Sequence, residues 1–247
     1  MNDDFVLQKE YDVHVYETDT DSKLNLTSLF NFFQDVASDH AEILGFGRND
    51  LMKHNHFWVL SRMYAEISVW PVWGERIIVK TYPNGTDKLF ALRNYEAFYP
   101  DGRPVASATS SWVILDLARK IQRPEAALSH FERYPERQNS LLRNATKLDF
   151  SGGELENSER FKVKISDLDI NLHTNNVKYL QWLIDAYDLD FVKQHTLHSV
   201  EINYLAEAFI NDDLMIQTYS DSYGFYNHSI IRSDGKELCR VQFRWLP

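Results

Sequence analysis

An internal repeat constrains the fold of this chain more than any other feature of its sequence. When the sequence is slid against itself by 150 positions without a gap, three apolar residues of one segment fall on three of another: Tyr11, Val13 and Val15 on Phe161, Val163 and Ile165. In both copies these residues alternate with others, as in a half-buried strand. The register continues through a polar loop into an amphipathic helix. This matched order indicates a duplication, so we expect two copies of one fold.

A helix is predicted after the polar loop in each copy. The first has apolar residues at three- and four-residue spacing, which run toward Gly45 and Gly47 as a helix stop: Leu29, Phe30, Phe33, Val36 and Ala37. The second has one apolar face, with Asn175 or Asn176 as its N-cap: Val177, Leu180, Ile184, Tyr187 and Phe191. Both helices are expected to be largely buried.

Strand-like alternation follows each helix. The first half has predicted strands at 58–68, 75–82, 89–99 and 104–116, with turns at Asn84-Gly85 and Asp101-Gly102. The second half has predicted strands at 198–208, 214–220, 226–232 and 238–245. We therefore predict an N-terminal domain at 1–135, a linker at 136–157 and a C-terminal domain at 158–247.

Each half is thus a strand, one long helix and an antiparallel sheet, which places the chain in the α+β class. A sheet wrapped around a central helix is called a hotdog fold. A single such unit exposes a sheet edge and half of its helix, so it normally pairs with a second copy. Here the second copy is covalent, and the prediction is a tandem double hotdog with two antiparallel sheets, each wrapped around a long helix.

Composition narrows the function. The formal charge of −10 disfavours a nucleic-acid or anionic-membrane partner, and the 14% aromatic share points to thick cores or a lined apolar cavity. Cys239 is the single cysteine, which excludes an intramolecular disulfide and a multi-cysteine zinc site. Residues 1–4 lack the features of a secretory signal, and no apolar run approaches the roughly 20 residues that span a bilayer. We expect a soluble, cytoplasmic protein without a metal or cofactor.

The densest polar constellation lies at 166–176. Asp169, Asn171 and His173 take alternate positions, separated by Ile170 and Leu172. In an extended stretch alternate residues share a face, so a carboxylate, an amide and an imidazole would lie together while the other side packs on apolar neighbours. Such a set suits proton transfer and binding of a substrate oxygen, and the following helix N-terminus adds oxyanion donors. The alternative is an Asx-type turn and a helix cap.

The first copy serves as an internal control for this constellation. Asp21 and Lys23 occupy the places of Asn171 and His173 there. The scaffold therefore accepts other side chains, and chemistry is expected in the second half only.

The run DLDINLHTNNVKY, residues 167–179, resembles the signature of the acyl-acyl-carrier-protein thioesterases, which cut the thioester of a finished fatty acyl chain. Residues 57–63, 70–75 and 110–113 resemble the first half of that family. Plant members carry an N-terminal targeting extension, and its absence here implies a bacterial-type enzyme.

The resemblance implies catalytic roles for Asp169, Asn171 and His173, and for Glu207 on the strand after the second helix. Plant members have a cysteine directly after that acid, where this chain has Ala208, so a thiol nucleophile at that place is ruled out. Two routes stay open. Water is activated by Glu207 or His173, with Asn171 and the helix N-terminus binding the carbonyl oxygen and Asp169 positioning the site, or Asp169 itself attacks and forms a mixed anhydride.

The resemblance also implies an acyl tunnel in the first half, lined by residues that could equally be plain core: Phe30, Phe33, Trp58, Leu60 and Met63. The candidate docking patch for an acidic acyl carrier protein is Arg119, Lys120 and Arg123, unless these are scattered solvated charges. A homodimer is left open. The alternatives in function are an acyl-CoA thioesterase, a hotdog dehydratase and a non-catalytic acyl-binding hotdog protein.

Overall fold

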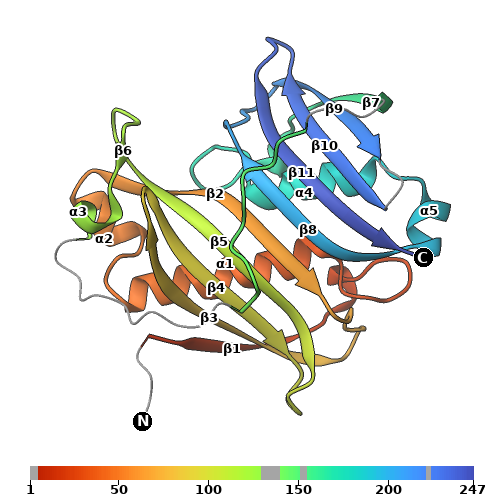
Figure 1. Cartoon of the computed structure of the whole chain (residues 1–247), viewed down its shortest axis with the longest axis horizontal. Helices are drawn as coiled ribbons and strands as arrows, with labels where there is room; N and C mark the ends of the chain where they lie inside the picture. Colours follow the sequence, from red (N-terminus) through yellow and green to blue (C-terminus); the bar gives the residue numbers. More distant parts are fainter. Residues whose placement is uncertain (1–4, 129–139, 151–154, 221–223) are drawn as a thin grey trace. The chain divides into compact units, whose positions relative to one another are not determined.

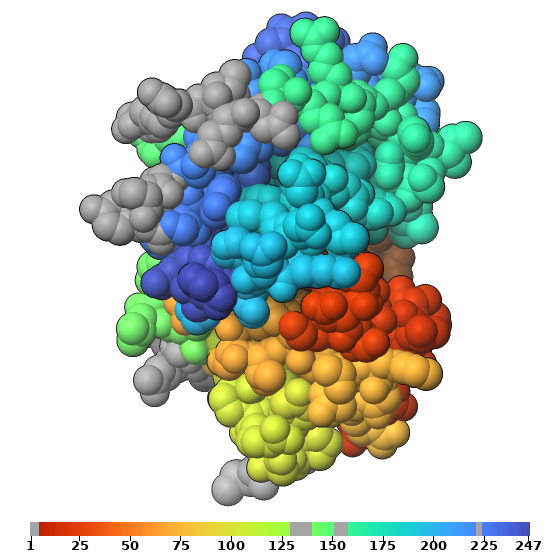
Figure 2. Space-filling view, turned by 90° about the vertical axis from the view of Figure 1, so that its right-hand side faces the viewer, coloured from red at the N-terminus to blue at the C-terminus, as the bar shows by residue number. Residues whose placement is uncertain are grey.

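The computed structural model describes residues 5–128, 140–150, 155–220 and 224–247. The chain divides into two compact units, Met1–Ala145 and Thr146–Pro247. Both have the order of strand, short 3-10 helix, long helix and antiparallel strands (Figure 1). The space-filling view shows the described residues of each unit closely packed on the face in view (Figure 2). The predicted linker at 136–157 lies partly outside the described residues.

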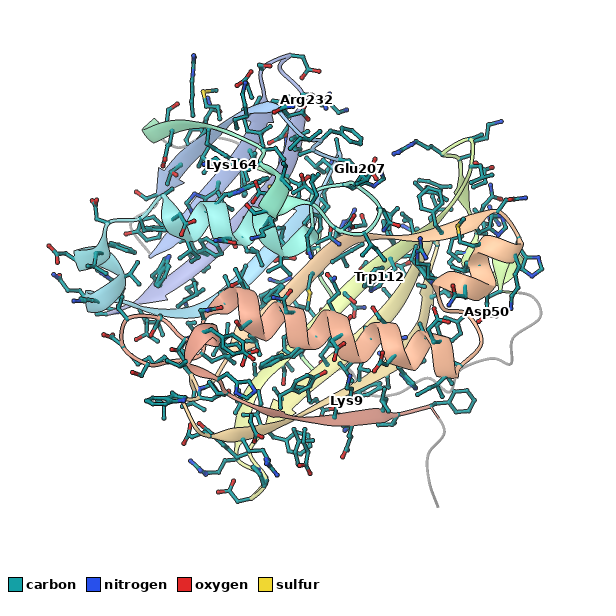
Figure 3. All side chains as sticks on the ribbon, turned by 180° about the vertical axis from the view of Figure 1, so that it is seen from behind. Lys9, Asp50, Trp112, Lys164, Glu207 and Arg232 are labelled. Atoms are coloured by element: carbon teal, nitrogen blue, oxygen red, sulfur yellow. The ribbon has the colours of Figure 1, made fainter. Side chains whose placement is uncertain are left out.

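Unit 1 is an antiparallel sheet with one long helix. Its elements are β1 (Leu7–Asp12), η1 (Val15–Glu17), α1 (Leu26–Ile43), α2 (Arg48–Lys53), β2 (His56–Ile67), β3 (Arg76–Asp87), β4 (Phe90–Phe98), β5 (Pro104–Asp116), β6 (Ile121–Gln122) and α3 (Pro124–Ala127). The strand order is β1-β3-β4-β5-β2, and β6 pairs with the end of β5. α1 lies along one face of this sheet (Figure 3).

The predicted face of the first helix is confirmed. All five of its apolar residues are buried: Leu29, Phe30, Phe33, Val36 and Ala37. The helix begins where Asn25 Oδ1 accepts a hydrogen bond from Ser28 N–H at 2.8 Å, since this bond satisfies a donor that the helix itself leaves free. It ends at Ile43, shortly before the predicted stop at Gly45.

Unit 2 repeats this plan with a shorter helix. Its elements are β7 (Leu155–Lys162), η2 (Ile165–Asp167), α4 (Asn176–Asp185), α5 (Leu189–Gln194), β8 (Thr196–Tyr204), β9 (Asp213–Ser220), β10 (Phe225–Arg232) and β11 (Glu237–Leu246). The strand order is β8-β11-β10-β9-β7, antiparallel throughout.

The sequence repeat is also a repeat of contacts. The rings of Tyr11 and Phe32 lie 4.3 Å apart and join β1 to α1. Phe161 and Trp182, their partners in the repeat, lie 4.8 Å apart and join β7 to α4. An aromatic pair at equivalent positions therefore joins the first strand to the main helix in each unit, and the two units share one architecture.

Three local predictions were wrong. Val15 and Ile165, expected in half-buried strands, lie in η1 and η2 and are 61% and 82% exposed. The apolar spacing from Val177 to Phe191 belongs to two helices, since α4 ends at Asp185 and Asp188 starts α5 as its N-cap. The rings of Tyr187 and Phe191 stack across this break, with their centroids 5.0 Å apart.

The turn predicted at Asn84-Gly85 is instead a bulge within β3. The ladder with β4 shifts register between Pro83 and Thr86, and Gly85 has a φ of 73°. The hairpin turns at Lys88, which has a φ of 55°. Asn-Gly suits a bulge as well as a turn, so the dipeptide alone does not decide between them.

Among the described residues, no helix is both long and apolar enough to cross a membrane.

Candidate active site

The candidate site of unit 2 is an imidazole and carboxylate pair. His173 Nδ1 lies 3.1 Å from Glu207 Oε1, and the two side chains are 33% and 27% exposed. The ring of Phe209 meets the imidazole edge to face at 5.4 Å. Glu207 lies at the end of the unit where α4 begins (Figure 3).

This geometry selects one tautomer of the imidazole. A carboxylate oxygen accepts hydrogen bonds, so the neutral tautomer of His173 that fits this contact carries its proton on Nδ1. The lone pair of the neutral ring then lies on Nε2. A half-buried imidazole in this state can take a proton from water or another weak acid that reaches Nε2.

The loop before His173 is closed around the carboxylate of Asp169. Asp169 Oδ1 accepts hydrogen bonds from Asn171 N–H at 2.8 Å and from His173 N–H at 3.2 Å. Asp169 N–H in turn donates to the His173 carbonyl at 2.8 Å. The chain therefore reverses within five residues, from Asp169 to His173.

The prediction that this loop is extended, with its apolar residues packed on one side, was wrong. Ile170 is 83% exposed and Leu172 is 72% exposed. Leu172 has a φ of 62°, in the left-handed region, and the Asp169 bonds curl the chain around it. The Asx-type turn that was the alternative is what forms.

Unit 1 contains the same loop without the same side chains. Asp19 Oδ1 accepts hydrogen bonds from Asp21 N–H at 2.9 Å and Lys23 N–H at 3.0 Å, and Ser22 has a φ of 61°. Since Asp19 is the repeat partner of Asp169, this carboxylate shapes the loop in both units. Only in unit 2 does the loop end in histidine.

Glu207 lies beyond the strand on which it was predicted. β8 ends at Tyr204, and the next two residues both donate their N–H groups to the Leu238 carbonyl. One backbone hydrogen bond then joins the two halves of the site, because Thr174 N–H donates to the Ala208 carbonyl at 3.1 Å. Thr174 directly follows His173, and Ala208 directly follows Glu207.

The equivalent backbone bond of unit 1 carries other side chains. Leu24 N–H, the repeat partner of Thr174 N–H, donates to the Pro71 carbonyl at 2.7 Å. Trp70 therefore stands where unit 2 has Glu207, and Lys23 stands where it has His173. The pair is a property of unit 2.

The other predicted residues of the site lie close by along the chain. Asn171 has an exposed side chain on the loop, two positions before His173. α4 begins at Asn176, where Asn175 Oδ1 accepts a hydrogen bond from Val177 N–H at 3.0 Å. Cys239 is fully buried on β11, and burial raises the pKa of its thiol well above the ordinary value.

The residues predicted to hold an acyl chain belong to the interior of unit 1. Four of them are buried: Phe30, Phe33, Leu60 and Met63. Trp58 is half-buried, and its Nε1–H donates to the Phe46 carbonyl at 2.9 Å. A core residue and a residue that lines a chain are both buried, so this role stays a prediction.

The predicted docking patch lies on the β5–β6 hairpin of unit 1 and directly after it, where Arg123 is the N-cap of α3. Arg119, Lys120 and Arg123 are all exposed there, and Arg119 turns the chain with a φ of 60°. Leu117 and Ile121, beside them, are exposed as well. The hairpin thus offers basic and apolar side chains together.

Fold and site together define a tandem double hotdog protein with an imidazole and carboxylate pair in its second unit. The family model of the acyl-ACP thioesterase N-terminal domain matches residues 4–127, and that of the C-terminal domain matches residues 153–247. The chain therefore belongs to the acyl-ACP thioesterase family.

Relatives with known names agree with this assignment. The chain is 29% identical to the chloroplastic palmitoyl-acyl carrier protein thioesterase of Gossypium hirsutum over 270 residues, which cover 100% of this chain and 65% of that protein. The chloroplastic oleoyl-acyl carrier protein thioesterase 2 of Arabidopsis thaliana is 25% identical over 90% of this chain and 65% of its own. The chain thus spans about two thirds of the length of these relatives.

Two solved structures share the fold over nearly the whole chain. An acyl-ACP thioesterase from Bacteroides thetaiotaomicron superposes with a TM-score of 0.89, 23% identity and 98% coverage of both chains. The 12:0-ACP thioesterase from Umbellularia californica gives a TM-score of 0.82 and 20% identity, also with 98% coverage of both.

Proposed function

We propose that this protein hydrolyses the thioester of fatty acyl-acyl carrier protein (ACP) to free fatty acid and holo-ACP. The observation that carries the proposal is the contact between His173 and Glu207 on the signature loop of the family. Family membership and the names of the relatives support ACP as the carrier.

The chemistry starts from the tautomer that Glu207 selects. His173 Nε2 takes a proton from water as the water oxygen attacks the thioester carbon, and Glu207 stabilises the imidazolium that forms. The tetrahedral oxyanion is stabilised by the Asn171 amide and the N-terminus of α4. When the carbon–sulfur bond breaks, the proton passes from Nε2 to the sulfur, and free acid and thiol leave.

Asp169 fits a positioning role in this scheme. Its Oδ1 accepts two backbone N–H bonds and so shapes the loop that carries His173. The same bonds occur at Asp19, in the unit that lacks the pair. The water route is therefore the one that the geometry supports.

The test is release of free acid from ACP loaded with short, medium and long acyl chains. His173→Ala and Glu207→Ala should each lower turnover at least about a hundredfold, as expected for general acid–base groups. Lys23→Ala, at the place of His173 in unit 1, is the matched control and should keep the wild-type rate. Wild-type turnover in either site variant would remove that residue from the mechanism.

The same assay separates the alternatives. Faster hydrolysis of the same acyl group on coenzyme A would identify an acyl-CoA thioesterase. An enoyl product from a 3-hydroxyacyl chain would identify a dehydratase, and binding without turnover a non-catalytic protein. Docking of ACP on Arg119, Lys120 and Arg123 is part of the proposal, as is a cytoplasmic, bacterial-type enzyme.

A further inference from the structure

A buried tyrosine of α4 holds the segment that carries Glu207. Tyr179 is 2% exposed, and Ala208 N–H donates to its Oη at 2.9 Å. The ring is fixed by Trp182 and Tyr204, at centroid distances of 5.3 and 5.7 Å. Burial raises the pKa of Tyr179 above its ordinary value, so the phenol stays neutral at physiological pH.

Ala208 is anchored on both sides of its backbone. Its N–H donates to Tyr179, and its carbonyl accepts from Thr174 N–H at 3.1 Å. The residue is fully buried, so water cannot replace either bond without opening the structure. Ala208 is thereby tied to α4 and to the loop of His173, and Glu207 precedes it directly.

Unit 1 has a segment equivalent to the one around Ala208, but with different residues. Pro71 corresponds to Ala208, because each accepts from the residue that follows the repeated loop. The next residues repeat too: Val72 N–H donates to Glu75 at 2.8 Å, and Phe209 N–H to Asp212 at 2.9 Å.

Two residue differences between the units explain why unit 2 needs the tyrosine. Leu29, the repeat partner of Tyr179, offers no acceptor, and Pro71 has no N–H that needs one. Proline also restricts the backbone of the residue before it, which in unit 2 would be Glu207. Ala208 leaves the backbone of Glu207 free of that restriction, and the Tyr179 bond supplies the anchor instead.

We infer that Tyr179 is a positioning residue that holds the Glu207 carboxylate against Nδ1 of His173. The inference rests on the proposed function. Loss of the phenol oxygen leaves the Ala208 N–H unsatisfied, so the segment shifts and the contact of 3.1 Å between carboxylate and imidazole loosens.

The test is Tyr179→Phe, with Tyr187→Phe as the matched control. Tyr187 Oη lies 2.7 Å from His228 Nε2, so the control also loses one hydrogen bond of unit 2, outside the pair. Tyr179→Phe should lower kcat on acyl-ACP about tenfold with KM unchanged. Tyr187→Phe should lower the melting temperature and keep kcat.

Two further measurements separate positioning from loss of stability. In a Glu207→Gln background, Tyr179→Phe should have no further effect on kcat. If Tyr179 acted independently of Glu207, the two reductions in kcat would multiply. The NMR signal of the His173 Nδ1 proton should be visible in the wild type and in Tyr187→Phe, and should broaden by exchange in Tyr179→Phe.

The outcomes distinguish this inference from the proposed function. Wild-type kcat and an unchanged Nδ1 signal in Tyr179→Phe would overturn the positioning role, as would a further loss of kcat in the Glu207→Gln background. Absence of turnover in the wild type would instead refute the proposed function, and the NMR comparison would still decide the role of Tyr179.

Discussion

Substitution of Asp169 separates its two candidate roles. Asp169→Ala removes both N–H bonds to Oδ1, which at roughly 1 kcal/mol each for a half-buried acceptor amounts to about 2 kcal/mol. For a chain of this size the melting temperature should fall by about 4–8 °C. Asp169→Asn keeps an oxygen at the same place, so it should lose much less stability.

Turnover of acyl-ACP gives the second readout. If Asp169 only shapes the loop, Asp169→Asn should keep kcat within about threefold, whereas Asp169→Ala should lower it about tenfold or more, because the backbone of His173 is released. Asp19→Ala is the matched control in unit 1, where the loop has the same two bonds. It should lower the melting temperature and leave kcat unchanged.

One result would refute this reasoning. If Asp169→Asn melted like the wild type but lost turnover by a thousandfold or more, as expected on removal of a nucleophile, the charge of Asp169 would act in the reaction itself. The mixed-anhydride route would then replace activated water.

Three more predictions concern other parts of the molecule. Cys239 is fully buried with a raised thiol pKa, so iodoacetamide should label it in denaturant but not in the folded protein, and treatment of the folded protein should leave turnover unchanged. Loss of turnover in the folded protein would restore a thiol role. Burial lowers the pKa of His228 from 6.5 to about 3. Between these two pH values the imidazole is protonated in the unfolded state and neutral in the folded state. The free energy of unfolding should therefore fall by up to about 1.4 kcal/mol per pH unit below pH ~6.5, and urea titrations of His228→Gln should lack this slope. Reversing the charge of Arg119, Lys120 and Arg123 together should raise KM for acyl-ACP at low salt about tenfold or more, with KM for acyl-CoA unchanged. A KM for acyl-ACP equal to that of the wild type would exclude the patch.

Most of the secondary structure was predictable because its signals are local. The strand predicted at 104–116 is observed as β5 (Pro104–Asp116), because its strand-forming residues and the turn before it at Asp101-Gly102 are both local signals. The predictions failed where one local pattern suits two structures. Gly85 serves a bulge as readily as a turn, and the apolar face through Phe191 continues over a break between helices.

The site was predictable only in part. The signature run singled out His173, and the resemblance singled out Glu207, but neither gave the distance between them or the tautomer that follows from it. Tyr179 ends the signature run, but no role was predicted for it, although the repeat contains a signal for one. Its partner there is Leu29, and a buried apolar position that becomes tyrosine in one copy needs a hydrogen-bond partner.

The loop of Asp169 is determined by the local sequence, whereas the contact of His173 with Glu207 is determined by the tertiary structure. The loop is set by bonds that join residues at most four positions apart, so the amino-acid order alone specifies it, and it forms in both units. The contact depends on β8 pairing with β11 and on Thr174 and Tyr179 binding Ala208, which brings distant segments together only when the sheet has closed around its helix. Hydrogen bonds between such segments form only after the chain entropy of bringing them together has been overcome, and packing of the whole unit supplies that free energy.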